Sequence, residues 1–297
     1  MTADFDSVLM SKHRLRSGMV AATSAIWTVL ASSATALEVR VAPDRPRLGD
    51  TLSVMVRTDD PDLPHPTVSV NGRTYETFLV GTNRYRAFLP TTPLEAPGTR
   101  TLQVSGDGAV ETVSVVVSDR SFPIQEIWLS PETNAIEGTD YEFDLVDAFK
   151  QLVSPERLWT GPFRPPSDGP VTTVYGVRRY YNGEWAENYY HRGIDYAAPA
   201  GAPVLAAARG RVALVGRESQ GFELHGNTVG LDHGQGVTTI YLHLSRIDVR
   251  EGQLVEAGQP IGAVGSTGIS TGPHLHWGLY VRGESVDPLP WQSLGLK

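Results

Sequence analysis

The stretch HLHWGLYVRG, residues 274–283, reads as a β-strand with histidines at positions i and i+2. Side chains two residues apart on a strand point to the same face, so His274 and His276 are expected to project into one cavity. Two adjacent histidines on one strand face seldom serve only to fill a protein core, because each buried neutral ring requires its own hydrogen-bond partners. The pair therefore predicts a site of chemistry on this strand.

The sequence around this stretch also indicates strands separated by tight turns. Seventeen of the 30 glycines fall between residues 193 and 283, too many for helices of useful length. We therefore expect a mainly β, antiparallel domain over residues 169–297 with a groove-type active site. Strand patterns occur in VTTVYGVRRYY, PVLAAARGRVALVG, NTVGLDHG and VTTIYLHLS, and the predicted groove walls are residues 217–226 and 262–272.

A second motif, HRGIDY at residues 191–196, supplies a histidine and a carboxylate four residues apart. The glycine and the following AAPAG favour a turn leading into a strand over a helix, and either geometry can bring both side chains to one metal ion. A third ligand from the His274/His276 pair would complete a His₂Asp set with room for water, as in catalytic zinc sites. Each motif alone arises often by chance, whereas their joint occurrence is specific.

The composition restricts the chemistry further. The 297 residues include no cysteine, which excludes disulfides, thiol nucleophiles and cysteine-ligated metals, so any metal must be held by nitrogen and oxygen. Six of the eight histidines lie between residues 191 and 276. The net charge of −8 and the lack of a basic stripe argue against nucleic acid as a partner.

The first 36 residues have the three parts of a secretory signal. Three basic residues precede an uncharged run from Ser17, which ends in the A-x-A site Ala34-Thr35-Ala36. The alternative is a membrane anchor, but serines and threonines leave the apolar core short for a span. We expect cleavage before Leu37, no stable membrane span afterwards, and a protein exported to the periplasm or cell envelope.

Residues 37–119 consist of short alternating apolar runs separated by turn signals such as Asn71-Gly72 and Asp107-Gly108. About seven strands in this length predict an immunoglobulin-like β-sandwich. Residues 120–168 are predicted to be a connector with one short helix, in which Phe143, Val146, Phe149 and Leu152 share an apolar face.

The motifs HRGIDYAAPAGAPVLAAARGRV, GNTVGLDHGQGVTTIYLHLS and VEAGQPIGAVGSTGISTGPHLHWGLY together resemble the lysostaphin-type, LytM-like zinc metalloendopeptidases that cleave peptidoglycan. The resemblance covers about residues 170–290 in the right order. It implies that His191, Asp195 and His276 bind one zinc ion and that His243, from YLHLS, and His274 are catalytic. Degenerate members that lost ligands activate other hydrolases, but this sequence retains all five residues.

Three further residues have alternative interpretations. His233 lies in LDHGQG, which is typical of a hairpin turn, and His225 either lines the groove or lies on its edge. Asn182 is a candidate for substrate binding, although Asn182-Gly183 equally reads as a hairpin turn. Either His243 or His274 could be the general base that takes a proton from the attacking water.

These observations predict an exported, monomeric zinc endopeptidase acting on peptide stems or cross-links of peptidoglycan. Zinc would supply the nucleophile by acidifying water, and a histidine would take its proton. The alternatives are a non-catalytic envelope regulator of other hydrolases and a protease of ordinary proteins.

Overall fold

The computed structural model describes residues 37–60 and 63–293. The predicted signal peptide, residues 1–36, lies outside the described residues. Within the described ranges, no helix is both long enough and apolar enough to cross a membrane.

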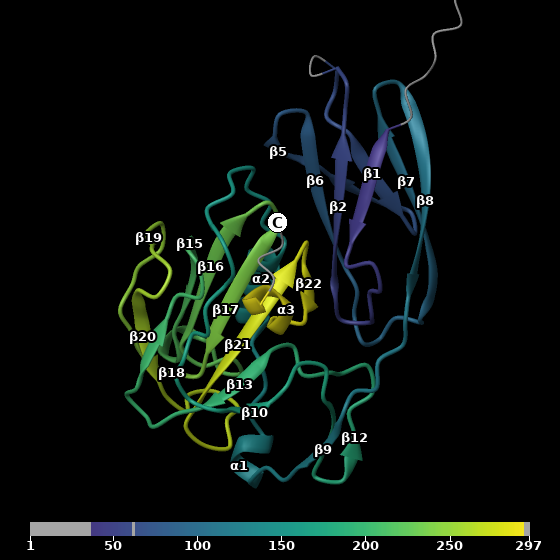
Figure 1. The fold of residues 1–297 in the computed structure, drawn as a ribbon. Helices are drawn as coiled ribbons and strands as arrows, with labels where there is room; N and C mark the ends of the chain where they lie inside the picture. The colour runs from purple at the N-terminus through teal and green to yellow at the C-terminus, as the bar shows by residue number, and fades with distance from the viewer. Residues whose placement is uncertain (1–36, 61–62, 294–297) are drawn as a thin grey trace, which may run out of the picture. The chain divides into compact units, whose positions relative to one another are not determined.

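The N-terminal part consists of two four-stranded antiparallel sheets that share one core (Figure 1). Apolar residues at alternate positions of β2, β3, β6 and β7 point inward and fill the space between the sheets. The described residues of this part form eight strands where the sequence suggested about seven, and the immunoglobulin-like comparison stays a prediction. One sheet has the order β1-β2-β6-β5 and the other β4-β3-β7-β8, with bounds β1 Glu38–Ala42, β2 Thr51–Arg57, β3 Thr67–Val70, β4 Arg73–Glu76, β5 Phe78–Gly81, β6 Arg84–Pro90, β7 Gly98–Gly106 and β8 Ala109–Val117.

The predicted connector contains more regular structure than its sequence indicated. Strand β9 (Ile124–Ile127) is followed by the short helix α1 (Pro131–Asn134) and by α2 (Asp140–Lys150). Thr139 caps α2 in a capping box with Glu142, each side chain bonding the other's backbone N–H.

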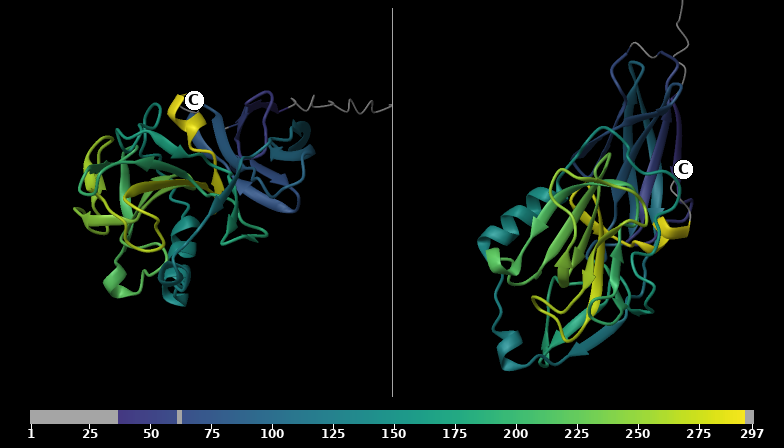
Figure 2. Two further views of the ribbon diagram at one scale, coloured as in Figure 1. Left: turned by 90° about the horizontal axis from the view of Figure 1, so that it is seen from below. Right: turned by 90° about the vertical axis from the view of Figure 1, so that its left-hand side faces the viewer.

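Helix α2 covers part of the large C-terminal sheet, as Figure 2 shows. Val146 and Phe149 are buried against side chains of β15, β17 and β21, with Leu152 partly buried beside them. The prediction for Phe143 was wrong: its side chain is 42% exposed. It lies in the first helical turn and meets the edge of His225 instead of the sheet, with ring centroids 6.2 Å apart.

The C-terminal part is built on an eight-stranded sheet in the order β10-β13-β21-β17-β16-β15-β19, with β22 paired to β21. Every strand pairing in this sheet is antiparallel. A separate three-stranded sheet has the order β14-β20-β18. The bounds are β10 Val171–Thr173, β13 Ile194–Ala197, β14 Pro203–Leu205, β15 Gly210–Gly216, β16 Thr228–Gly234, β17 Val237–Leu242, β18 Leu244–Ile247, β19 Leu254–Val255, β20 Pro260–Val264, β21 His274–Val281 and β22 Glu284–Val286, with a 3₁₀ turn at Glu218–Gln220 and helix α3 at Leu289–Ser293.

A third small sheet ties the connector to the C-terminal part. Strand β9 pairs with β11 (Arg178–Tyr181), which also pairs with β12 (Glu184–Trp185). The β9–β11 pair is parallel, unlike the antiparallel pattern expected from the sequence. Parallel strands require a long intervening segment, here residues 128–177, and period-two patterns do not reveal such pairing.

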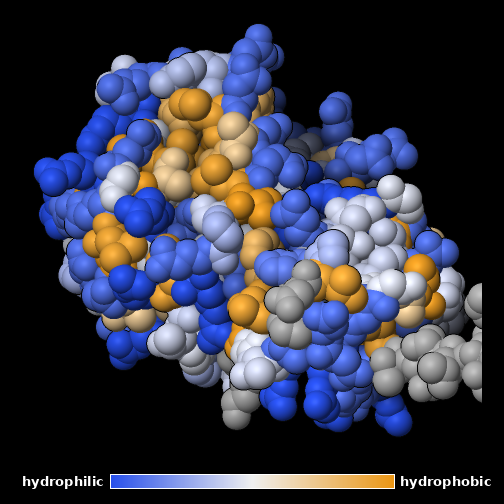
Figure 3. Space-filling model, turned by 90° about the horizontal axis from the view of Figure 1, so that it is seen from above, coloured by the Kyte–Doolittle hydropathy of each residue, from blue (hydrophilic) through white to orange (hydrophobic). Residues whose placement is uncertain are grey.

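The core of the C-terminal part includes one residue from β6. Phe88 packs with Trp159 and Trp291 in the same cluster as the buried strands of the large sheet. The space-filling view in Figure 3 shows hydrophobic residues gathered in patches within a largely hydrophilic surface.

Candidate metal and catalytic site

The centre of the site is a cross-strand pair. Strands β13 and β21 are antiparallel, and their register places Asp195 directly opposite His276. Residues opposite each other on neighbouring strands project to the same face, so the carboxylate meets the imidazole. His191 lies in the extended segment just before β13, which confirms the turn-into-strand interpretation of HRGIDY and excludes a helix there.

Gly193 permits the close approach of the His191 segment to β21. A Cβ at this position would lie 2.4 Å from the Trp277 carbonyl oxygen and 2.7 Å from the His276 ring. A Cβ atom this close would clash with the backbone of β21, so packing requires the glycine of the H-x-G-x-D motif.

Three potential ligand atoms converge at this point. His191 Nε2 lies 2.9 Å from Asp195 Oδ1 and 3.0 Å from His276 Nδ1, and His276 Nδ1 lies 3.0 Å from Asp195 Oδ1. All three residues are buried, and their ligand atoms lie within 4.8 Å of one another. The structure thus brings together the three predicted ligands.

The hydrogen-bond pattern shows that this group suits a cation. His191 Nδ1 donates to the Val174 carbonyl at 2.9 Å, so in the neutral ring Nε2 presents a lone pair to Asp195 and His276. Burial opposes the charge of Asp195, but the two adjacent histidines hold its pKa well below the ordinary range, and burial lowers the pKa of His276 to about 4. Two imidazoles and one carboxylate form the donor set that fits zinc.

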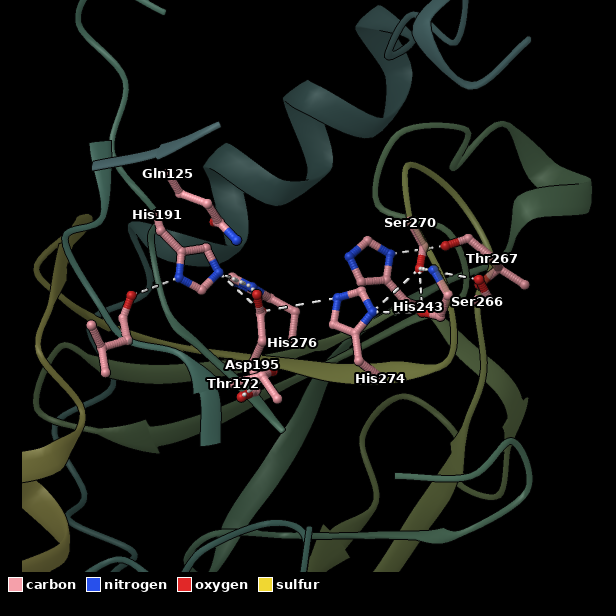
Figure 4. A network of polar contacts seen from close by, with 12 residues as sticks. Gln125, Thr172, His191, Asp195, His243, Ser266, Thr267, Ser270, His274 and His276 are labelled. Carbon is pink, nitrogen blue, oxygen red and sulfur yellow. Dashed lines mark hydrogen bonds and ion pairs between the residues drawn. The ribbon is translucent and has the colours of Figure 1, made fainter. Parts of the chain in front are cut away.

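A second pair of histidines lies beside the first group, as Figure 4 shows. The rings of His243 and His274 are 4.8 Å apart, and His274 Nε2 lies 4.0 Å from Asp195 Oδ1. Each ring has Nδ1 2.8 Å from a backbone carbonyl, that of Thr267 for His243 and that of Gly272 for His274. A carbonyl only accepts, so each Nδ1 is the donor and each Nε2 is available to exchange a proton.

The backbone and the environment of His243 are both unusual. Its φ is +64°, in the left-handed region that non-glycine residues rarely adopt and that recurs at functional sites. Burial and the neighbouring His274 and His276 rings lower the pKa of His243 to about 3. The ring is therefore neutral at physiological pH and able to accept a proton.

The two groups open onto a cavity of about 750 Å³. The predicted groove walls both contribute to it, with Leu224 and His225 from one and the segment from Ile269 to Pro273 overlapping the other. His225 therefore lines the cavity, and its Nδ1 lies 2.9 Å from the buried carboxylate of Glu142 in α2.

Several lining residues were missed by the sequence analysis. Arg179 and Tyr181 face the cavity from β11, together with Tyr189 and with Gln125 of β9. The alternation of Arg179 and Tyr181 in RRYY is a strand signal that could have been used. No sequence pattern marks Gln125 as a cavity residue, because only the pairing of β9 with β11 brings it to the site.

The structure does not bring Asn182 or His233 to the cavity. Asn182 has φ +51° in the turn after β11, where its amide accepts from Leu129 N–H and donates to Asn134. His233 belongs to β16, not to the turn that follows at residues 235–236. Both its ring nitrogens are hydrogen-bonded, to the Arg209 carbonyl and the Thr239 hydroxyl, and burial lowers its pKa to about 4.

The segment that carries the predicted ligands and catalytic histidines is similar to known peptidases. Residues 189–288 match the sequence model of peptidase family M23. The DD-carboxypeptidase/endopeptidase Mpg of Neisseria meningitidis serogroup B is 48% identical over 99 residues, which are 33% of this chain and 22% of that protein. The peptidoglycan DD-endopeptidase ShyB of Vibrio cholerae is 42% identical over 156 residues, 52% of this chain and 31% of that protein.

A solved structure extends the similarity beyond the matched segment. The crystal structure of a putative peptidase M23 from Pseudomonas aeruginosa superposes with a TM-score of 0.62 at 27% identity, covering 84% of this chain and 95% of that one. This chain spans less than a third of the length of the two curated relatives. The resemblance seen in the sequence is thereby confirmed: residues 189–288 form a peptidase domain of family M23.

Proposed function

We propose that this chain is a zinc metalloendopeptidase that hydrolyses peptide bonds in the stems or cross-links of peptidoglycan. The observation that carries the proposal is the convergence of His191, Asp195 and His276 beside two histidines whose Nε2 atoms are available. The names of the relatives, peptidoglycan DD-endopeptidases among them, support this substrate class.

His191 Nε2, Asp195 Oδ1 and His276 Nδ1 would hold the zinc ion. When bound, zinc lowers the pKa of a coordinated water to about 7 and polarises the scissile carbonyl. The neighbouring His243 and His274 are placed to move protons: one Nε2 takes the proton of the attacking water, and a histidine N–H stabilises the oxyanion or protonates the leaving amine. The carbonyls of Thr267 and Gly272 keep each Nδ1 protonated and each Nε2 directed to the reaction.

The experiment is digestion of purified sacculi by the full chain, with released muropeptides identified by mass spectrometry. We expect cleavage, its loss with a chelator, and its recovery with zinc. His243→Ala and His274→Ala should each lose cleavage yet retain zinc, and the exposed His65→Ala serves as control. Bound zinc without any cleavage would favour the regulator alternative, and full activity without metal would refute the mechanism.

We also propose that the protein is exported, cleaved before Leu37 and monomeric. The signal-like sequence of residues 1–36 and a substrate found in the cell envelope support export. N-terminal sequencing of the exported protein should begin at Leu37, and its mass in solution should be that of one chain. A retained leader would contradict the cleavage, and a stable dimer would contradict the monomer.

A further inference from the structure

Arg179 lies at the edge of the proposed metal site without being one of its ligands. It projects from β11 into the cavity, and its side chain is only 11% exposed. A guanidinium with this little access to water needs polar partners on all its nitrogens, because an unpaired buried charge is costly.

Every nitrogen of the Arg179 guanidinium has such a partner. Nε donates to Gln125 Oε1 at 3.2 Å, and Nη1 donates to the hydroxyls of Tyr181 and Tyr189, each at 3.1 Å. Nη2 forms an ion pair with Asp195 Oδ2 at 3.7 Å. The guanidinium therefore bridges the connector strand β9, its own strand β11, the segment before β13, and the carboxylate of a proposed zinc ligand.

The two oxygens of Asp195 have different surroundings as a result. Oδ1 faces the ring nitrogens of His191 and His276, whereas Oδ2 faces the guanidinium of Arg179. A free carboxylate can bind a metal through one or both oxygens, and partners outside the ligand set fix which of these occurs.

The position of Arg179 is itself set by the parallel pairing of β9 with β11. The register places Arg179 beside Gln125, so the amide of a connector residue lies next to the guanidinium. Tyr181 and Tyr189 pack edge to face at 5.8 Å and hold their hydroxyls at Nη1. These contacts leave the fork-shaped side chain little freedom to turn away from Asp195.

We propose that Arg179 is a positioning residue of the metal site, which holds Asp195 Oδ2 so that the carboxylate offers only Oδ1 to the zinc ion. The proposal rests on the zinc site of the proposed function. It also makes the connector strand part of that site, because Gln125 orients Arg179.

Arg178 provides a matched control. It is the adjacent residue of β11 with the same charge, but alternation directs its side chain to the other face, where it lies over the Trp185 ring at 5.0 Å. It does not line the cavity. Arg178→Gln and Arg179→Gln thus remove the same charge from neighbouring positions, while Arg179→Lys keeps the charge without the planar fork.

The test compares these full-length variants with the unaltered chain in two metal-binding assays. Zinc affinity is measured by competition with a chromophoric chelator, and the coordination number is read from the visible spectrum of the Co²⁺-substituted protein. We expect Arg179→Gln to weaken zinc binding about 10–100-fold. Its Co²⁺ bands should weaken, since a carboxylate bound through both oxygens raises the coordination number. Arg179→Lys should be intermediate and Arg178→Gln unchanged.

Steady-state cleavage supplies a third readout, in which Arg179→Gln lowers kcat more than it changes KM. If Arg179→Gln does not fold, Gln125→Leu removes only the partner of Nε and should weaken zinc binding several-fold in the same direction. Unaltered zinc affinity and an unaltered Co²⁺ spectrum in the folded Arg179 variants, or in Gln125→Leu, would overturn the proposal. If the unaltered chain itself binds no zinc, the proposed function fails instead, so the two failures are distinguishable.

Discussion

The two β-rich parts of the molecule use the same strand periodicity to bury different kinds of side chain. In the N-terminal sheets, inward positions such as Val54, Val68 and Leu102 are apolar and fully or almost fully buried. In the C-terminal sheet, β13 and β21 direct Ile194 and Leu275 into the core, and the alternate face buries Asp195 and His276 beside the cavity. Apolar burial stabilises a fold by itself, whereas buried polar groups must be offset by hydrogen bonds or a cation. The comparison teaches that the proposed site of chemistry is marked by the convergence of buried histidines with a carboxylate, and not by strand periodicity.

The largest effect is expected from removing one of the proposed ligands. Asp195→Ala takes away the only carboxylate of the group and should abolish zinc binding. Because a bound metal supplies several kcal/mol of transition-state stabilisation, cleavage of sacculi should fall by about 1,000-fold or more. Zinc content by atomic absorption and muropeptide release measure both effects. Retained zinc in this variant would show that the group of His191, Asp195 and His276 is not the metal site.

A core truncation in the N-terminal sheets should act on stability instead. Leu102 of β7 is fully buried, and Leu102→Ala should lower the free energy of unfolding by about 2–5 kcal/mol through lost burial and a residual cavity. The folded variant should still bind zinc. Val116→Ala, at a position 61% exposed, is the control and should change stability by less than about 0.5 kcal/mol. Urea unfolding compares them, and equal midpoints would mean that the N-terminal core contributes nothing.

Glu142 tests whether polar burial outside the metal site is also offset by hydrogen bonds. Its buried carboxylate accepts from the backbone N–H groups of Leu224 and His225 and lies beside the His225 ring. Glu142→Gln weakens the acceptor set and should cost about 1–3 kcal/mol, loosening the cavity wall at His225. Asp144→Asn, on the exposed face of the same helix, is the control. The unfolding midpoints of the two variants are compared at neutral pH. Equal losses of stability in both variants would contradict the stabilising role of the Glu142 hydrogen bonds.

The same carboxylate predicts a pH dependence. Burial tends to raise the pKa of Glu142, but hydrogen bonds with His225 and the backbone dominate and lower it from 4.5 to about 2. A depressed pKa in the folded state means that the stabilisation is fully present above about pH 4.5 and is lost as the pH falls toward 2. The stability difference between the unaltered chain and Glu142→Gln should therefore shrink over that interval. If this stability difference instead grows as the pH falls, the pKa of Glu142 is not lowered in the folded protein and the prediction is wrong.

The smallest effect is expected at the surface. Arg73 and Glu284 form an ion pair at 3.7 Å with both side chains nearly half exposed. Glu284→Gln should change the free energy of unfolding by at most about 1 kcal/mol, and added salt should diminish the difference. Thermal unfolding of the unaltered chain and of Glu284→Gln at low and high salt measures this difference in stability. A loss above about 2 kcal/mol would show that exposed charge matters here as much as burial.

The sequence predicted the ligand candidates because their spacing follows local geometry. His274 and His276 share a strand face by alternation, and His191 and Asp195 lie within one short motif. It did not predict the exposure of Phe143, since a helical period does not say which part of the helix lies over the sheet. It also missed the contact between Arg179 and Gln125, which are 54 residues apart in the chain and meet only through the pairing of their strands.

By itself, the sequence determined the strand-rich character of the chain, the nitrogen and oxygen chemistry available to it, and the residues able to hold a metal. Alternation, turn glycines and the absence of cysteine are properties of residue types and short spacings, which no distant contact alters. The tertiary structure alone decided that Asp195 faces His276 across two strands and that Arg179 reaches the second oxygen of that carboxylate. Strand register and parallel pairing depend on contacts between segments far apart in the chain, and local patterns carry no information about them.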